Sequence, residues 1–242
     1  MEPTELVSKA CPKIGDLGSA FYFDSETLAK GKELGLDGFR FYFLGRGGVL
    51  GDVEARVVQS AFGYFAPGLV GKIWSTAKEV MPPRDAGRAY LACAQEFGRR
   101  KFSAIDGLDA FCEAAGAIND AADPASLALY AAASAEPLCD DLPGRAMQLV
   151  TVLREYRGSA HLAAIRTLNL DAGVAHAIKR PDDVSTFGYA EPPAITDEHR
   201  ALHTRAEEFT DQMVLGAYSA VDADGAAALM AGLEAMEAAV AG

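Results

Sequence analysis

The chain has 242 residues, of which 50% are hydrophobic and 23% are charged, and its formal net charge at pH 7 is −12. This composition excludes a disordered or collagen-like protein and predicts a globular chain with a sizeable core, in one large domain or in two of roughly 120 residues. Residues 1–100 carry 13 basic and 12 acidic side chains, whereas residues 101–242 carry 9 and 22. Because Lys and Arg supply most affinity for phosphates, we do not expect DNA as a partner.

Cysteine usage and the N-terminus bear on location. The four cysteines, Cys11, Cys93, Cys112 and Cys139, show no metal-ligand spacing, so we expect buried, reduced thiols. The chain starts without a basic leader, and no apolar run reaches the roughly 18 residues of a membrane-spanning helix. We therefore expect a cytoplasmic protein with no membrane partner.

Apolar residues at three-to-four spacing predict helices along most of the chain, with Gly, Pro or Asp between them. The predicted helices cover residues 25–34, 37–44, 52–62, 67–80, 86–101, 106–122, 125–135, 145–168, 171–180, 196–218 and 222–241. The segment 136–143, Glu-Pro-Leu-Cys-Asp-Asp-Leu-Pro, is the clearest break in this pattern. We predict a domain boundary there, between a helical, aromatic-rich domain (1–140) and a second domain (141–242).

The second domain has its own order of elements. Helix 145–168 is followed by a short turn and by helix 171–180, after which residues 184–195 lose helical periodicity. This segment contains Thr186, Phe187, Tyr189 and two prolines, which suits a two-stranded wing. The predicted fold is therefore mainly α, with a helical N-terminal half and a winged helix-turn-helix-like C-terminal half that carries a small β-wing.

Two resemblances follow from these segments. Residues 195–211, Ile-Thr-Asp-Glu-His-Arg-Ala-Leu-His-Thr-Arg-Ala-Glu-Glu-Phe-Thr-Asp, resemble the wing exit and long helix of MarR-type regulators. The chain also resembles a family of actinobacterial helix-turn-helix-derived proteins through residues 42–46 (Tyr-Phe-Leu-Gly-Arg) and 154–161 (Arg-Glu-Tyr-Arg-Gly-Ser-Ala-His). The second resemblance implies a fold and no particular activity. The first implies DNA binding, and a homodimer formed through the helices 196–218 and 222–241.

Charge argues against a working DNA reader. The predicted recognition helix offers cations only at its end, as Lys179 and Arg180, although base contacts come mostly from the N-terminal part of such a helix. The predicted wing contains Asp182, Asp183 and Glu191 and no arginine. Its charge is therefore negative, whereas a wing that enters a minor groove needs positive side chains. We interpret the fold as retained and the DNA function as lost.

Aromatic residues are concentrated early, because 11 of the 21 lie between Phe21 and Trp74. Such a group can line a cavity for a flat or apolar ligand, or it can simply fill a core that is otherwise rich in alanine and leucine. Arg46 lies among these rings and needs solvent or an anionic partner. We predict a ligand pocket lined by Arg46, Tyr64, Phe43, Phe65, Trp74, Arg154, Arg157, His161 and His176.

Arg154, Arg157 and His161 share one helical face. That face could receive a carboxylate, or it could be a solvated polar surface. The first functional hypothesis is a small-molecule-binding protein for an apolar or planar anionic ligand. An alternative is an enzyme with His161 as general acid or base, Arg157 as anion stabiliser and Tyr42 as auxiliary donor. A second alternative is a MarR-like DNA-binding regulator, and no motif specifies a reaction or a cofactor.

Two further motifs are set aside. The glycines of segment 45–51 fit neither phosphate-binding fingerprint, and we interpret them as a helix end followed by a tight turn. His199, His203 and Glu207 are spaced four residues apart on one helical face. A closed zinc site needs a fourth ligand that the sequence does not identify, so no metal site is predicted.

Overall fold

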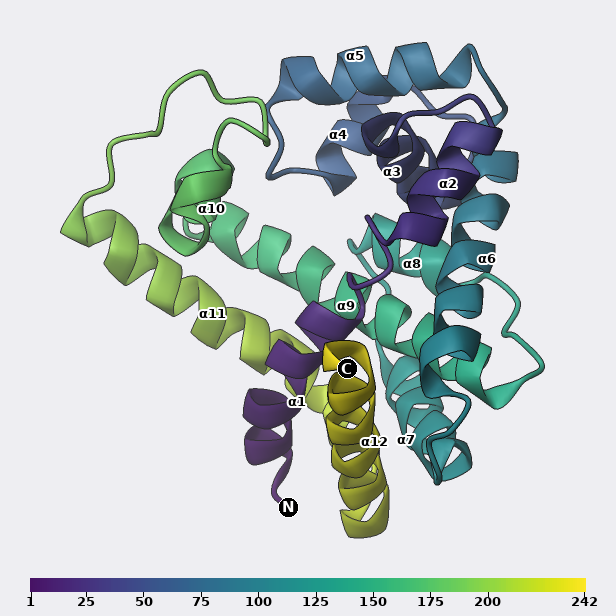
Figure 1. The fold of residues 1–242 in the computed structure, drawn as a ribbon. Coiled ribbons are helices and arrows are strands. Elements are labelled where there is room, and N and C mark those ends of the chain that lie inside the picture. The colour runs from purple at the N-terminus through teal and green to yellow at the C-terminus, as the bar shows by residue number, and fades with distance from the viewer.

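The computed structural model describes all 242 residues, and every regular element in it is a helix (Figure 1). The mainly helical class predicted from the sequence is therefore confirmed. The elements are α1 (Pro3–Leu17), α2 (Ser25–Glu33), α3 (Gly38–Gly47), η1 (Gly48–Leu50), α4 (Ala55–Ala61), α5 (Pro67–Lys78), α6 (Pro83–Phe102), α7 (Leu108–Ala121), α8 (Ala128–Ser134), α9 (Leu142–Thr167), α10 (Ala172–Lys179), η2 (Pro181–Asp183), α11 (Asp197–Tyr218) and α12 (Ala223–Ala241).

Short polar side chains define several helix starts. Asp37, Asp141, Asp171 and Asp222 each accept a hydrogen bond from the backbone N–H three residues later, which satisfies a donor that the first helical turn leaves free. No helix is predicted before residue 25, and the structure adds α1, which continues through Pro12. Pro12 is exposed, and the opposite face of α1 buries apolar residues against the core.

Helix α9 is the central element and passes through the middle of the molecule in Figure 1. It packs against α6, α7 and α8 on one side and against α1 and α11 on the other. The apolar core runs from Leu6 to Met236, so its residues come from both sides of position 140. A smaller cluster joins the end of α9 to α10 and α11.

Close packing explains part of the glycine-rich segment 45–51, which covers the last turn of α3 and the following η1. A Cβ on Gly45 would lie 2.5 Å from Cβ of Tyr90, and a Cβ on Gly48 would collide with the carbonyl oxygen of Pro83. Both positions face α6. Gly51 has φ of 89°, a left-handed value that favours glycine, and it ends the segment in a turn.

The predicted β-wing is wrong, because residues 184–195 contain no strand. Instead this stretch, the 184–195 loop, folds onto the first half of the chain. The Phe187 ring stacks on Phe65 with centroids 4.1 Å apart, and the Ala66 N–H donates to the Phe187 carbonyl at 2.8 Å. Pro192 and Pro193 have no N–H for a strand pair, and the half-buried Phe187 packs on Phe65 rather than on a partner strand.

The last two helices pack within the chain. Helix α11 contacts α9, α1 and α7, and α12 contacts α7 and α1. In Figure 1 the C-terminal end of α12 lies beside α1 near the centre of the view. Pairing of two chains through α11 and α12 remains a prediction. No helix combines the length and the apolar character needed to cross a bilayer.

Candidate functional site

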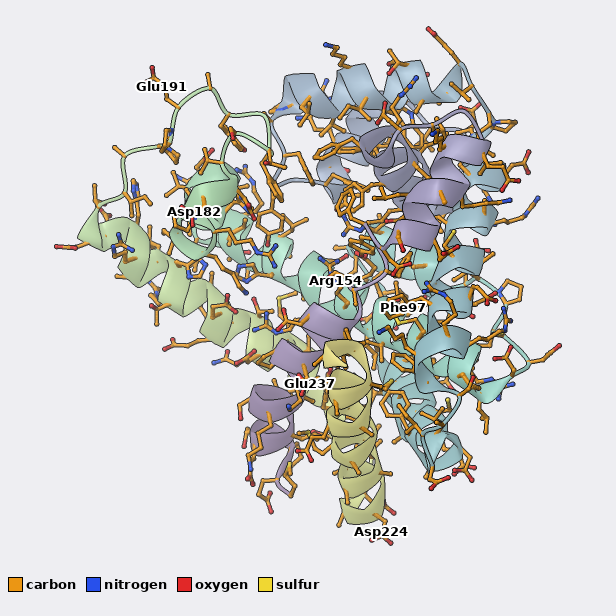
Figure 2. The ribbon with its side chains drawn as sticks, viewed as in Figure 1. Phe97, Arg154, Asp182, Glu191, Asp224 and Glu237 are labelled. Carbon is orange, nitrogen blue, oxygen red and sulfur yellow. The ribbon has the colours of Figure 1, made fainter.

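A cleft of about 490 Å³ lies where α1, α3, α9, α10 and α11 meet, with residues 61–65 and Phe187 completing its lining. Figure 2 labels Arg154, a lining residue that lies on α9 near the middle of the molecule. Five cations and three carboxylates line the cleft, an excess of positive charge in a protein of net charge −12. These charged residues are Arg46, Arg154, Arg157, Lys179, Arg180, Asp16, Glu155 and Glu207.

The inner wall of the cleft is organised around Glu155, which is 3% exposed. Arg46 donates from Nε to Oε1 and from Nη2 to Oε2 of this carboxylate, each at 2.7 Å. The Tyr22 hydroxyl donates to Oε1 at 2.9 Å and accepts from Arg154 Nη1 at 2.9 Å. Arg46 also donates from Nη1 to the Tyr42 hydroxyl at 2.8 Å. Two arginines thus share one buried carboxylate, which leaves a net positive charge on this wall.

Two ionisation states follow from this arrangement. Burial opposes ionisation of Glu155, but the Arg46 guanidinium outweighs it, and the pKa of Glu155 falls to about 2. Burial raises the pKa of the Tyr22 hydroxyl, which stays protonated and can donate. The inner wall is therefore a fixed set of charges and donors at neutral pH.

The outer wall joins α9 to α11. Arg157 Nη2 donates to Glu207 Oε2 at 2.7 Å and to Asp211 Oδ1 at 2.8 Å. Burial opposes ionisation of Glu207, but the hydrogen bond from Arg157 outweighs it and lowers the pKa of that carboxyl. Lys179 lies on the rim, with Nζ 3.9 Å from Glu207 Oε1 and its side chain 62% exposed.

His161 occupies the bottom of the outer wall. Its Nδ1 lies 2.8 Å from the Thr210 hydroxyl, and the Tyr64 ring lies nearly parallel to the imidazole at 6.3 Å. Burial lowers the pKa of His161 to about 4, so its imidazole is neutral at pH 7. Burial also lowers the pKa of His176 and of His203.

Two buried side-chain polar atoms have no hydrogen-bond partner, namely Arg157 Nε and His176 Nε2. Both residues line the cleft. An unpaired buried donor or acceptor costs about 1–3 kcal/mol, so such atoms are rare without a reason. Arg157 Nε and His176 Nε2 are therefore exceptions among the buried side-chain polar atoms of the chain.

The structure brings most of the predicted site residues together. Tyr42, Arg46, Tyr64, Phe65, Arg154, Arg157, His161 and His176 all line the cleft. The predicted ligand-binding residues Phe43 and Trp74 do not line it, because both are buried in the apolar core. The Trp74 indole N–H is satisfied internally by the Val53 carbonyl at 3.0 Å.

Several cleft residues escape sequence reasoning. Glu155 lies between two predicted arginines, and its partner Arg46 is far away in sequence, so no local pattern pairs them. Tyr22 does not itself line the cleft but donates to Glu155, and it is one of many early aromatic residues. His203 and Glu207 are visible as an i, i+4 pair, but their meeting with His161 depends on how α11 crosses α9.

Comparison with known proteins identifies the class of fold. Residues 8–192 match the model of a helix-turn-helix family, and because this match covers well over half of the chain, the protein belongs to that family. No curated protein and no solved structure matches the chain. The matched region includes both walls of the cleft except for α11, and it ends within the 184–195 loop.

The sequence prediction places a helix-turn-helix pair at residues 145–168 and 171–180, and in the structure these residues form α9 and α10, which are joined by a short turn. Asn169 in the turn has φ of 53°, a left-handed value that asparagine tolerates well. Helix α10 is largely buried from Gly173 to Ala177, and a Cβ on Gly173 would lie 2.6 Å from the Tyr189 ring. The N-terminal part of α10 is thus covered by the 184–195 loop.

Proposed function

We propose that the cleft binds a small molecule that has a flat or apolar body and an anionic group. The observation that carries this proposal is that the only two buried side-chain polar atoms without a partner, Arg157 Nε and His176 Nε2, belong to residues that line one cleft. A ligand that accepts a hydrogen bond from Arg157 and pairs with the His176 imidazole would remove both costs.

The chemistry of the lining supports an anionic, aromatic ligand. Arg154 and Lys179 are both partly exposed cations of the cleft, with side chains 25% and 62% exposed. Rings from Phe62, Tyr64 and Phe65 offer flat contact surfaces. An anion next to guanidinium groups gains charge-assisted hydrogen bonds, and the rings bury the apolar remainder.

Thermal unfolding with a matched pair of probes tests the proposal. We expect 2-naphthoate to raise Tm by roughly 5–10 °C at about 100 times its dissociation constant, and neutral 2-naphthol to raise it far less. Arg154→Gln should reduce the shift, whereas Arg166→Gln should not, because Arg166 lies on the same helix outside the cleft. Equal shifts for the two probes, or for the two variants, would contradict an anion site in the cleft.

DNA binding is the second candidate, and membership of a helix-turn-helix family favours it. Against it, base contacts come mostly from the N-terminal part of a recognition helix, and that part of α10 is buried under Tyr189. The cations Lys179 and Arg180 lie near Glu207 and Asp183 respectively. A MarR-type regulator is therefore the weaker proposal.

Fluorescence anisotropy separates these two functions. With a labelled random-sequence duplex at 50 mM salt, we expect a flat titration up to about 10 µM protein, since even non-specific DNA readers bind at 10⁻⁴–10⁻⁶ M at physiological salt and more tightly at lower salt. Saturable binding that the Lys179→Ala, Arg180→Ala double variant abolishes would favour DNA binding instead.

An enzyme that uses the same cleft remains an alternative proposal. His161 is neutral at pH 7 and therefore suits a base rather than an acid. Its support is the cluster of Arg157, Tyr64 and His161 within one cleft.

A further inference from the structure

Three residues with metal-binding side chains meet on the outer wall of the cleft: His161 from α9, and His203 and Glu207 from α11. One ligand atom of each lies within 4.8 Å of the other two. Glu207 Oε1 is 3.8 Å from His161 Nε2 and 3.9 Å from His203 Nε2. His199, the third member of the i, i+4 series in the sequence, is elsewhere, because its Nδ1 accepts the Thr196 N–H at the start of α11.

The hydrogen bonds of His161 determine which ring nitrogen is free. The Thr210 hydroxyl donates its single proton to the Ala206 carbonyl at 2.6 Å. The same oxygen can therefore only accept from His161, so Nδ1 carries the imidazole proton. In the neutral ring Nε2 then carries no proton, and it lies on the side of Glu207. A hydrogen bond that fixes the tautomer in this way is typical of metal-binding histidines.

The other two side chains are equally free to bind. Arg157 holds Glu207 through Oε2, which leaves Oε1 without a hydrogen bond. His203 makes no hydrogen bond with the protein, and its side chain is 14% exposed.

We propose that His161, His203 and Glu207 hold one divalent transition-metal ion, zinc or ferrous iron, whose remaining coordination positions open into the cleft. Two imidazoles and one carboxylate form the ligand set both of catalytic zinc sites with an open position and of non-haem iron sites. Bonds of about 2.0–2.2 Å require ligand atoms about 3.3 Å apart, so the three atoms must approach one another by roughly 0.5–1.5 Å. Rotation of the His203 and Glu207 side chains supplies this movement.

Lys179 is the competitor of the metal. Its ammonium lies 3.9 Å from the same Oε1 atom that the ion would bind, and the exposed side chain can turn away into solvent. The site lies in the cleft of the proposed function, but it does not depend on that function, because the ion needs no organic ligand.

The experiment measures the metal content of the purified full-length chain and then titrates metal-free protein with Zn²⁺, and with Fe²⁺ under anaerobic conditions. We expect one equivalent of one of these ions, and a dissociation constant that weakens more than 100-fold in His203→Ala. His199→Ala is the matched control and should bind as the wild type does, because His199 lies one turn earlier on α11 and outside the cleft.

Two further variants test the surroundings rather than the ligands. Thr210→Val removes the acceptor of the His161 proton, and we expect about 10–100-fold weaker binding. Lys179→Ala should bind the ion roughly fivefold more tightly, because it removes a nearby cation. Circular dichroism spectra of all variants establish that each is folded.

Less than a tenth of an equivalent of bound metal, or equal affinity in His199→Ala and His203→Ala, would overturn the metal site. The two proposals fail separately, because 2-naphthoate binding is measured on metal-free protein and metal uptake is measured without 2-naphthoate.

Discussion

Arg46 on α3 and Glu155 on α9 are 109 residues apart in sequence and form a two-pronged ion pair, with both N–O distances at 2.7 Å. The pair connects the two halves of the chain at the inner wall of the cleft. Because the Glu155 carboxylate is buried, the loss of Arg46 would leave its charge undercompensated.

We therefore expect Arg46→Met to lower the free energy of unfolding by about 3–5 kcal/mol. The double variant Arg46→Met, Glu155→Gln removes the buried charge as well and should recover part of that loss. Urea denaturation followed by circular dichroism measures both values. A loss below about 1 kcal/mol in the single variant would mean that Arg154 and Tyr22 alone satisfy Glu155.

Acid should weaken the fold through the same carboxylate. The pKa of Glu155 is about 2 in the folded protein and about 4.3 in an unfolded chain, so the folded state holds the proton less tightly. Its stabilising contribution, about 3 kcal/mol, is present above pH 4.3 and is lost as the pH falls toward 2. Urea midpoints across this range measure the effect. Glu155→Gln should flatten this part of the profile, and an unchanged slope in that variant would contradict the assignment.

The contact between Gly48 and α6 should tolerate no side chain. A Cβ on Gly48 would collide with the Pro83 carbonyl and approach the Gly87 nitrogen to 2.9 Å, so we expect Gly48→Ala to destabilise the protein by about 3 kcal/mol. Gly71→Ala is the control, because Gly71 lies inside α5 with no neighbour within 4 Å. That substitution should stabilise by about 0.5–1 kcal/mol. Thermal melts of the two variants should therefore move in opposite directions.

Phe187 should hold the 184–195 loop in place. Phe187→Ala removes the stacking on Phe65 and on His176, whose ring centroid lies 3.6 Å from that of Phe187. We expect amide hydrogen exchange at Ala66 and in the loop to accelerate at least about tenfold, while exchange in the core stays slow. Glu191→Ala, at the outer turn of the loop in Figure 2, should leave these rates unchanged. Uniform acceleration across the chain would indicate global destabilisation instead.

Local patterns predict the helices well, because apolar spacing and capping residues are properties of neighbouring positions. Helix α5, for example, begins at Pro67, as its proline at the first position predicts. Helix α1, which the patterns do not predict, shows the limit of this approach, because it continues through Pro12 while its other face buries apolar residues. The wing prediction fails for a related reason. Phe187 stacks on Phe65, a residue far away in sequence that no local pattern links to it.

The cleft is predictable only in part. Arg154, Arg157 and His161 share a helix face, and this local pattern correctly places all three in the lining of the cleft. Which histidine joins His203 and Glu207 depends instead on the crossing of α9 and α11. The i, i+4 spacing within α11 would place His199 next to His203 and Glu207. In the structure His161 of α9 lies next to Glu207, and His199 instead accepts the Thr196 N–H.

Helix α9, with 26 residues, carries both walls of the cleft. Arg46, near the beginning of the chain, is anchored to it through Glu155, and Glu207, near the end, is anchored through Arg157. An occupant that touches both walls would add a direct link between α3 and α11 beside the one that α9 provides. Deuterium uptake in α3 and α11 should then slow in concert, so that two separate opening events become a single cooperative one.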